Sequence, residues 1–187
     1  MRIISGNLKG KKLSFLGASK TRPLKDMVRE SIFNIIAHSN LINVEINNSE
    51  ILDLYSGTGS FGIECLSRNA KKVTFVEKDL EATEILKKNI NFLSINNKCS
   101  IYQDSVEKFL KQKNLKNKFD IFFLDPPFSD NYFIKDLALI KETIDFNKDH
   151  LAIIHLEKKS QTNLNEVLNT ILVKNYGRSK IIFGRLV

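Results

Sequence analysis

The sequence predicts an α/β fold built on one mostly parallel sheet of seven strands. From residue 50 onward, short runs of β-branched and apolar residues alternate with amphipathic stretches of helical length. A glycine-rich turn joins the first run to the first of these helices. The last two runs are joined by too few residues for a crossover helix, so they should pair antiparallel as a C-terminal hairpin. Such alternation places helices on both faces of the sheet.

The expected elements follow one another at short intervals. The strands are expected at residues 51–54, 72–76, 99–102, 119–124, 150–155, 171–176 and 180–186. The helices between them are expected at residues 61–68, 80–93, 106–112, 133–143 and, with a weaker pattern, 164–168. Most of the strands are rich in Val, Ile, Leu or Phe, as strands buried on both faces must be.

Residues 1–48 are predicted to form a small basic extension ahead of a core domain at residues 49–187. Two short strands around a Gly-containing turn, and then an amphipathic helix, are expected at residues 2–6, 11–15 and 24–38. A polar, Asn-rich stretch then leads into the core domain.

Composition bounds the class of protein. The chain has 187 residues, of which 42% are hydrophobic and 27% charged, which is ordinary for one soluble domain. No apolar run approaches the roughly 18 residues that span a bilayer, and residues 1–6 do not resemble a signal peptide. We therefore expect a cytoplasmic protein with no membrane partner.

The net charge of +8 is concentrated at the N-terminus. Residues 1–30 carry eight Lys or Arg and two acids, a net charge of +6, whereas the other 157 residues carry +2. This distribution fits an electrostatic contact with a polyanion, and it also fits a solvated basic tail without a partner.

Cysteine and histidine are sparse. Cys65 and Cys99 form no CxxC motif, and the three histidines are scattered along the chain. We expect free thiols in a reducing compartment and no metal centre.

A glycine-rich turn follows the first expected strand. Its glycines, Gly57, Gly59 and Gly62, form a GxGxxG pattern. Glycines between a strand and a helix permit a tight turn and the close approach of a ligand, but nicotinamide enzymes share this pattern. Asp53 favours S-adenosylmethionine, because a carboxylate repels a pyrophosphate. It attracts the ammonium and sulfonium groups of that methyl donor, directly or through hydrogen bonds of the loop.

Acidic residues also follow the second and third expected strands. Glu77 comes directly after strand 72–76, where an acid can accept both hydroxyls of a ribose in either class of enzyme. Asp104 and Ser105 come just after strand 99–102. The Asp can accept from the amino group of an adenine, yet both residue types are also common helix N-caps. An adenosine-containing ligand is expected, and either role is open to Asp104 and Ser105.

The most specific motif is Asp125-Pro126-Pro127-Phe128, directly after strand 119–124. The two prolines fix the backbone and donate no N–H, which leaves the Asp125 carboxylate and the Pro126 carbonyl as acceptors. Phe128 can stack on a flat base. Two acceptors that grip the hydrogens of an exocyclic amine favour a pyramidal nitrogen and aim it at a methyl donor. The motif therefore indicates methyl transfer to the amino group of a base.

Together these motifs resemble the class I methyltransferases that act on amino groups of nucleic-acid bases. Blocks in the N-terminal part resemble, more narrowly, the bacterial RsmD family, which methylates N2 of one guanine in 16S ribosomal RNA. These blocks are Arg2-Ile3-Ile4-Ser5-Gly6, Gly10-Lys11-Lys12-Leu13, Thr21-Arg22-Pro23 and Val28-Arg29-Glu30-Ser31-Ile32-Phe33-Asn34. The resemblance covers essentially the whole chain. It implies the Rossmann-like fold of class I enzymes and an S-adenosylmethionine-dependent rRNA (guanine-N2-)-methyltransferase.

The resemblance also implies a role for each motif residue. The methyl donor would be bound by Asp53, Gly57, Gly59, Glu77, Asp104 and Ser105, and the target guanine by Asp125, Pro126 and Phe128. RNA contacts are expected from Lys9, Lys11, Lys12, Arg22 and Arg29. The substrate would be 16S rRNA within the 30S subunit or a late precursor, and we expect a monomer. The chain departs from the family at one place: members tend to have the sequence Arg-Pro-Thr, whereas this chain has Arg22-Pro23-Leu24-Lys25.

Three other interpretations stay open at this point. The same grip on an amine would suit a DNA or other RNA amino-methyltransferase acting on adenine N6 or cytosine N4. The glycine turn and Glu77 alone would suit a nicotinamide-dependent oxidoreductase. A non-catalytic RNA-binding module with a degenerate core is the third, and the intact Asp125-Pro-Pro-Phe128 motif argues against it.

Overall fold

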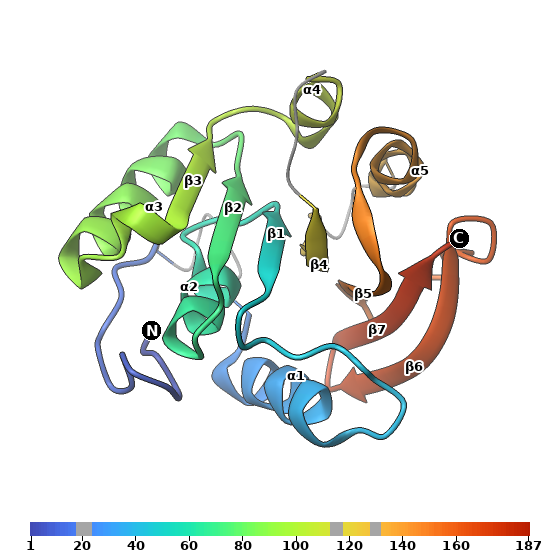
Figure 1. The fold of residues 1–187 in the computed structure, drawn as a ribbon, viewed down its shortest axis with the longest axis horizontal. Helices are drawn as coiled ribbons and strands as arrows, with labels where there is room; N and C mark the ends of the chain where they lie inside the picture. The colour runs from blue at the N-terminus through green and yellow to red at the C-terminus, as the bar shows by residue number, and fades with distance from the viewer. Residues whose placement is uncertain (18–23, 113–117, 128–131) are drawn as a thin grey trace.

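The structure is a computed structural model that describes residues 1–17, 24–112, 118–127 and 132–187. Seven strands form one mixed sheet in the order β3-β2-β1-β4-β5-β7-β6 (Figure 1). The strands are β1 (Glu50–Leu54), β2 (Lys72–Val76), β3 (Cys99–Tyr102), β4 (Phe119–Leu124), β5 (Phe146–Glu157), β6 (Leu168–Tyr176) and β7 (Ser179–Leu186). Strands β1 to β5 pair in parallel, and β7 pairs antiparallel with both β5 and β6. The predicted fold class is confirmed.

Helices cover both faces of this sheet. They are α1 (Asp26–His38), α2 (Ser60–Ser67), α3 (Leu80–Leu93), α4 (Val106–Leu110) and α5 (Phe133–Thr143), with a short 3-10 helix, η1 (Asn96–Lys98), before β3. Helices α1, α2 and α3 pack on one face and α4 and α5 on the other (Figure 1). Strand β4 serves both layers, because Ile121 and Phe123 point to the first and Phe122 and Leu124 to the second.

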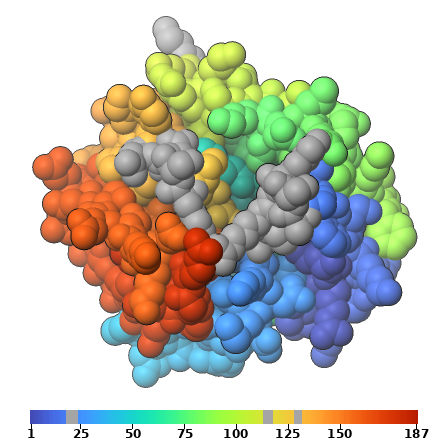
Figure 2. All heavy atoms as spheres, turned by 180° about the vertical axis from the view of Figure 1, so that it is seen from behind, coloured from blue at the N-terminus to red at the C-terminus, as the bar shows by residue number. Residues whose placement is uncertain are grey.

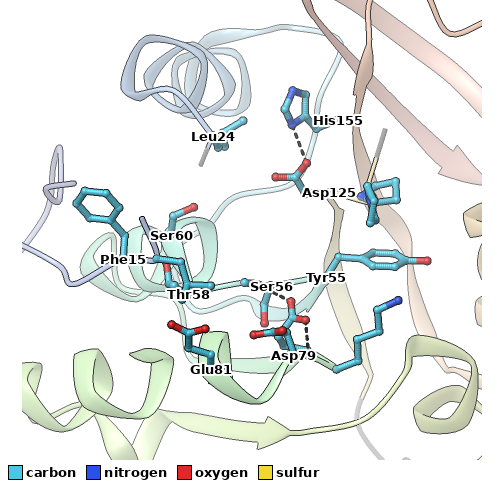
Figure 3. A pocket seen from close by; sticks show the side chains of 16 residues that line it. Phe15, Leu24, Tyr55, Ser56, Thr58, Ser60, Asp79, Glu81, Asp125 and His155 are labelled. Carbon is cyan, nitrogen blue, oxygen red and sulfur yellow. Dashed lines mark hydrogen bonds and ion pairs between the residues drawn. The ribbon is translucent and has the colours of Figure 1, made fainter. Parts of the chain in front are cut away.

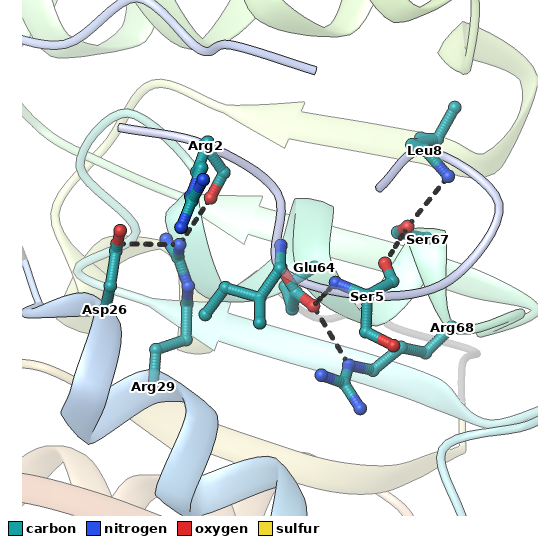
Figure 4. A network of polar contacts seen from close by, with 9 residues as sticks. Arg2, Ser5, Leu8, Asp26, Arg29, Glu64, Ser67 and Arg68 are labelled. Carbon is teal, nitrogen blue, oxygen red and sulfur yellow. Dashed lines mark hydrogen bonds and ion pairs between the residues drawn. The ribbon is translucent and has the colours of Figure 1, made fainter. Parts of the chain in front are cut away.

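The first 17 residues do not form the two strands that the sequence predicts. The two arms of this segment meet at an isolated antiparallel bridge between Arg2 and Lys12 and are joined by a few backbone hydrogen bonds. The backbone of this segment also bonds to helix α2: the buried carboxylate of Glu64 accepts from the N–H of Ile4 at 2.8 Å and of Ser5 at 2.9 Å (Figure 4). Because α2 supplies these acceptors, the segment needs no long hairpin ladder.

Side chains of the N-terminal segment enter the core of the sheet. Ile3 and Leu13 are buried in the same cluster as residues of α1, α2 and β1. A stack of aromatic rings adds to this layer, with centroids 5.2 Å apart between Phe33 and Phe61 and 3.9 Å apart between Phe61 and Phe123. The expected extension and the sheet therefore share one hydrophobic core.

Arg29 contradicts its expected role. Its side chain is buried, and Nη2 donates to the carbonyl of Arg2 at 2.6 Å and to Oδ1 of Asp26 at 2.9 Å (Figure 4). Burial lowers the pKa of the guanidinium, and Asp26 opposes that shift. The prediction that Arg29 faces RNA is wrong, because its position shares the buried face of α1 with Ile32 and Phe33.

Several boundaries also differ from the prediction. The expected helix at residues 164–168 is a turn, and β6 begins at Leu168. Strand β5 begins at Phe146, four residues earlier than predicted, and its first part bends at an irregularity in its pairing with β4. Helix α4 ends at Leu110 rather than at residue 112. These differences lie away from the carboxyl ends of β1, β2 and β4.

The described ranges hold neither a membrane-spanning helix nor a cluster of metal ligands. None of the helices found there has the length and apolar character needed to cross a bilayer. Within the same ranges, no three His, Cys, Asp or Glu side chains gather as a metal site would require. Cys65 is a buried free thiol, and Cys99 is a partly buried one.

Candidate active site

A pocket of about 600 Å³ opens at the carboxyl ends of β1, β2, β4 and β5. Strand order reverses between β1 and β4, and ligands of open α/β sheets bind at such a switch point. Figure 2 shows this side of the molecule hollowed beside α3, with teal residues of the turn after β1 at the floor. The lining residues are Phe15, Leu16, Leu24, Tyr55, Ser56, Gly57, Thr58, Ser60, Glu77, Lys78, Asp79, Glu81, Asp125, Pro126, Pro127 and His155.

The glycines of the turn after β1 serve either ligand access or close packing. Gly57, at φ +54°, lines the pocket, and a Cβ there would meet no atom within 4 Å. Gly59, at φ +85°, lies against α3, where a Cβ would come 2.3 Å from Leu86 Cδ1. A Cβ on Gly62 would lie 2.4 Å from the ring of Phe75. Gly57 thus leaves room for a ligand. Gly59 allows the turn to pack closely on α3, and Gly62 allows α2 to pack closely on β2.

Asp53 lies beneath this turn and does not line the pocket. Its side chain is buried, and Oδ2 accepts from the N–H of Gly62 at 3.0 Å. Oδ1 has no hydrogen-bond partner within the part of the chain that the structure describes. Burial raises the pKa of Asp53 well above its ordinary value, and Asp125 and Glu77 raise it further. Asp53 therefore organises the loop, and the direct attraction to a cationic ligand suggested by the sequence does not apply.

Glu77 connects the ends of β1 and β2. Its Oε2 accepts from the N–H of Gly57 and its Oε1 from the N–H of Asp79, each at 2.8 Å (Figure 3). Asp79 in turn caps α3 by accepting from the N–H of Ala82 at 2.8 Å. With Glu81, these residues give the pocket an acidic wall on the β2 side.

Ser105 caps a helix, Asp104 precedes it, and neither residue is among those that line the pocket. Ser105 Oγ accepts from the N–H of Lys108 at 3.3 Å, which makes Ser105 the N-cap of α4. Asp104 Oδ1 accepts from the N–H of Ser105 at 2.8 Å and lies 3.8 Å from Lys108 Nζ. The structure shows the capping role for Ser105, one of the two roles that the sequence left open.

Asp125 and Pro126 lie across the pocket from this acidic wall. Asp125 directly follows β4. Among the side chains that the structure describes, its carboxylate bonds only to His155, whose Nδ1 lies 2.8 Å from Oδ1. Pro126 is buried at the pocket edge. Phe128, the third residue expected to hold the base, lies outside the described residues.

The residues expected to contact RNA lie elsewhere. Lys9, Lys11 and Lys12 are exposed in the N-terminal segment and do not line the pocket. Lys11 Nζ lies 6.0 Å from the ring centroid of Phe92, an aromatic side chain that is itself exposed. Arg22 lies outside the described residues.

A family model described as Conserved hypothetical protein 95 matches residues 1–185. The chain belongs to this family. A Haemophilus influenzae relative named Ribosomal RNA small subunit methyltransferase D is 38% identical, over 84% of this chain and 79% of its own. The Escherichia coli relative of the same name is 32% identical, over 88% and 77%. The resemblance to the RsmD family is confirmed.

Two solved structures share the fold. The Escherichia coli protein yhhF, assigned as a methyltransferase, superposes with a TM-score of 0.83 at 27% identity, over 99% of this chain and 97% of its own. A Haemophilus influenzae protein assigned as a methylase has a TM-score of 0.77 at 32% identity, over 98% and 96%.

Of the residues that sequence reasoning singled out in this family member, the structure gathers Gly57, Glu77, Asp125 and Pro126 around one cavity. It adds several that were missed, above all His155, Tyr55 and the acids Asp79 and Glu81. His155 carried a usable signal, because it closes the expected strand 150–155 and the carboxyl ends of parallel strands meet at one edge. Tyr55 carried none, since its place depends on a left-handed backbone at φ 58°.

Proposed function

We propose that this chain is a methyltransferase that transfers a methyl group from S-adenosylmethionine to N2 of a guanine in 16S ribosomal RNA. The observation that carries the proposal is the position of Asp125-Pro126 on the same cavity as the Gly57 turn and Glu77. A grip for an amine would thus share one cavity with a site for an adenosine-containing ligand. The relatives named ribosomal RNA small subunit methyltransferases support the RNA substrate.

The charges of the pocket fit S-adenosylmethionine. Four carboxylates line it, and Lys78 is the one Lys or Arg among its described lining residues. The carboxylates are Glu77, Asp79, Glu81 and Asp125. Such a wall suits an ammonium and a sulfonium, and it opposes a pyrophosphate, which argues against a nicotinamide dinucleotide. The volume of about 600 Å³ is typical of small-molecule sites. This electrostatic support comes from the pocket wall rather than from buried Asp53.

The residues that would hold the methyl donor lie on one side of the pocket. Glu77 would accept from the ribose hydroxyls through lone pairs that its bonds to Gly57 and Asp79 leave available. Gly57 would let the donor approach the backbone, since no side chain occupies that space. Asp53 would hold the loop in shape from beneath through Gly62.

When bound, S-adenosylmethionine supplies an electrophilic methyl group on a positively charged sulfur. The chain's own contribution is positioning. The Asp125 carboxylate and the Pro126 carbonyl would accept the two hydrogens of the target amine and orient its lone pair. Both residues stand at the end of β4, beside the turn after β1, so the amine would be held next to the proposed donor site.

The basic N-terminal segment would contact the RNA. Lys9, Lys11 and Lys12 are exposed and project from a segment that Glu64 and the core hold in place. Phosphate contacts of this kind position a nucleic acid without reading its sequence. The substrate in this account is 16S rRNA in the 30S subunit or a late precursor, and the enzyme acts as a monomer.

Transfer of labelled methyl groups tests the function. With S-adenosylmethionine as donor, we expect the protein to label 30S subunits that lack the modification, and digestion to yield labelled N2-methylguanosine. Asp125→Ala should abolish transfer and keep donor binding, while Asp149→Ala, a change at an exposed acid paired loosely with Arg185 at 3.8 Å, should keep both. Label on duplex DNA alone would contradict the proposal.

A further inference from the structure

A line of hydrogen bonds runs from the pocket into the sheet through His155. Nδ1 of His155 lies 2.8 Å from Asp125 Oδ1 (Figure 3), and Nε2 lies 2.9 Å from Ser179 Oγ. The three residues come from β5, the end of β4 and the start of β7, three adjacent strands. The imidazole and the Ser179 side chain are buried, whereas Asp125 reaches the pocket with 24% of its side chain exposed.

The partners of the imidazole fix which nitrogen carries the proton. An ionised carboxylate can only accept, so Nδ1–H donates to Oδ1 of Asp125. Nε2 then accepts the hydroxyl hydrogen of Ser179. The ring is held on both sides by regular strands, and side chains on strands are positioned more precisely than those on loops.

The bond leaves the two oxygens of Asp125 in different situations. Oδ1 is engaged by His155, while within the described parts of the chain no donor lies at hydrogen-bond distance from Oδ2. Without a partner, the terminal torsion of an Asp side chain is broad, and the carboxylate plane can turn. Holding Oδ1 fixes that plane and determines where Oδ2 points.

We propose that His155 is a positioning residue that fixes Asp125 through Oδ1, so that Oδ2 is the oxygen that accepts from the target amine. This proposal rests on the proposed function, because it assigns a role within the same amine-binding site. His155 acts through Asp125 and does not touch the reacting atoms. Its effect falls on the orientation of the amine toward the methyl donor, where misplacement by about 1 Å can cost roughly 100-fold in rate.

A matched pair of substitutions separates this role from mere packing. In His155→Asn the amide N–H takes the place of Nδ1–H and can still donate to Asp125. In His155→Gln the amide reaches toward Ser179 and leaves Oδ1 without its donor. We expect His155→Gln to lower kcat about 10-fold to 100-fold, with KM for 30S subunits and the affinity for S-adenosylmethionine unchanged. His155→Asn should restore most of kcat.

Equal losses of kcat in both variants, or a change confined to KM, would overturn the proposal. A second measurement needs no activity: nitrogen-15 NMR of the wild-type histidine side chains. We expect His155 to carry its proton on Nδ1, and a ring protonated on Nε2 alone would overturn the proposal. If the wild type transfers no methyl group to 30S subunits, the proposed function fails, and the NMR result still decides whether His155 donates to Asp125.

Discussion

At the residue scale, Glu77 shapes the pocket through its own hydrogen bonds, without a ligand. Its two oxygens hold the backbone N–H groups of Gly57 and Asp79, which belong to the turns after β1 and β2. One carboxylate thus sets the spacing of the two turns that would enclose the methyl donor. A ribose would add hydrogen bonds to lone pairs already pointing into this gap.

Removal of this carboxylate should weaken donor binding. In Glu77→Ala we expect the Kd for S-adenosylmethionine to rise about 10-fold or more, because hydrogen bonds to a charged group are worth about 1.5–3 kcal/mol. Titration calorimetry checks this, with Glu84→Ala as the control, since Glu84 is exposed and pairs with Lys87 on α3. Unchanged affinity in Glu77→Ala, or binding of NADH by the wild type, would contradict the assignment.

The buried carboxyl group of Asp53 should make the free energy of unfolding depend on pH. Burial raises its folded-state pKa above the unfolded value of about 3.9, so between these two values the folded protein binds more protons than the unfolded chain. Its contribution to stability is therefore fully present below the unfolded pKa and is lost as pH rises through the folded pKa. Asp53→Asn keeps an oxygen for the N–H of Gly62 and removes the titration.

We expect the free energy of unfolding of the wild type to fall relative to that of Asp53→Asn as pH rises from about 4 to about 8. Denaturant unfolding at several pH values measures the difference. A difference that does not change with pH would show that Asp53 titrates alike in both states.

The candidate site could be predicted only where chain position determines it. Glu77 and Asp125 directly follow expected strands, Gly57 lies in the turn after another, and the carboxyl ends of parallel strands meet at one edge of the sheet. The RNA contact expected of Arg29 came from the family resemblance, and its burial involves a bond to the carbonyl of Arg2, which only the fold brings close. The hydrogen bond between His155 and Ser179 depends on the antiparallel pairing of β5 with β7, which the sequence pattern does not predict.

At the scale of elements, helix α2 lies very close to β2. Gly62 permits this approach, because a Cβ there would come 2.4 Å from the ring of Phe75 and 2.8 Å from Val73 Cγ1. The same helix supplies Glu64, which holds the N-terminal segment, so its position affects both the pocket and the extension.

A methyl group at this contact should destabilise the fold. In Gly62→Ala, overpacking costs about 1–3 kcal/mol and better helix propensity returns up to about 1 kcal/mol. We therefore expect a net loss of about 1–2 kcal/mol in the free energy of unfolding. Gly17→Ala is the control, because a Cβ there meets nothing within 4 Å and should change little. Equal stability of the two variants would contradict the close packing of α2 on β2.

Most elements of the sheet followed from periodicity, and the exceptions have physical reasons. Strands β2, β3 and β4 have the predicted bounds, since each is a short apolar run between clear turns. The two predicted N-terminal strands are reduced to one antiparallel bridge and a few backbone hydrogen bonds, because Glu64 and Ser67 of α2 satisfy part of that backbone. The helix expected at 164–168 was wrong because Leu168 pairs with Leu186 in the closing hairpin.

At the scale of the whole molecule, charge is divided between two regions. Acids line the pocket, while basic residues are concentrated in the N-terminal segment, where Lys9, Lys11 and Lys12 are exposed. This separation suits an enzyme that attracts a cationic donor at one place and a polyanionic substrate at another.

Binding of RNA should therefore depend on salt through the N-terminal segment. Replacing Lys9, Lys11 and Lys12 by Ala should weaken binding to a 16S rRNA fragment and flatten the plot of log K against log salt concentration by about 2 to 3. Replacing Lys118, Lys141 and Lys148, exposed residues near the amino ends of β4 and β5, is the charge-matched control. An equal change of slope in both triple variants would contradict a specific role for the segment.

The most direct test of the central claim is mass mapping of 16S rRNA from a strain that lacks this gene. We predict that one N2-methylguanosine is replaced by guanosine in the deletion strain. The wild-type gene should restore the methyl group, and the Asp125→Ala gene should not. A full set of N2-methylguanosines in the deletion strain would contradict the account.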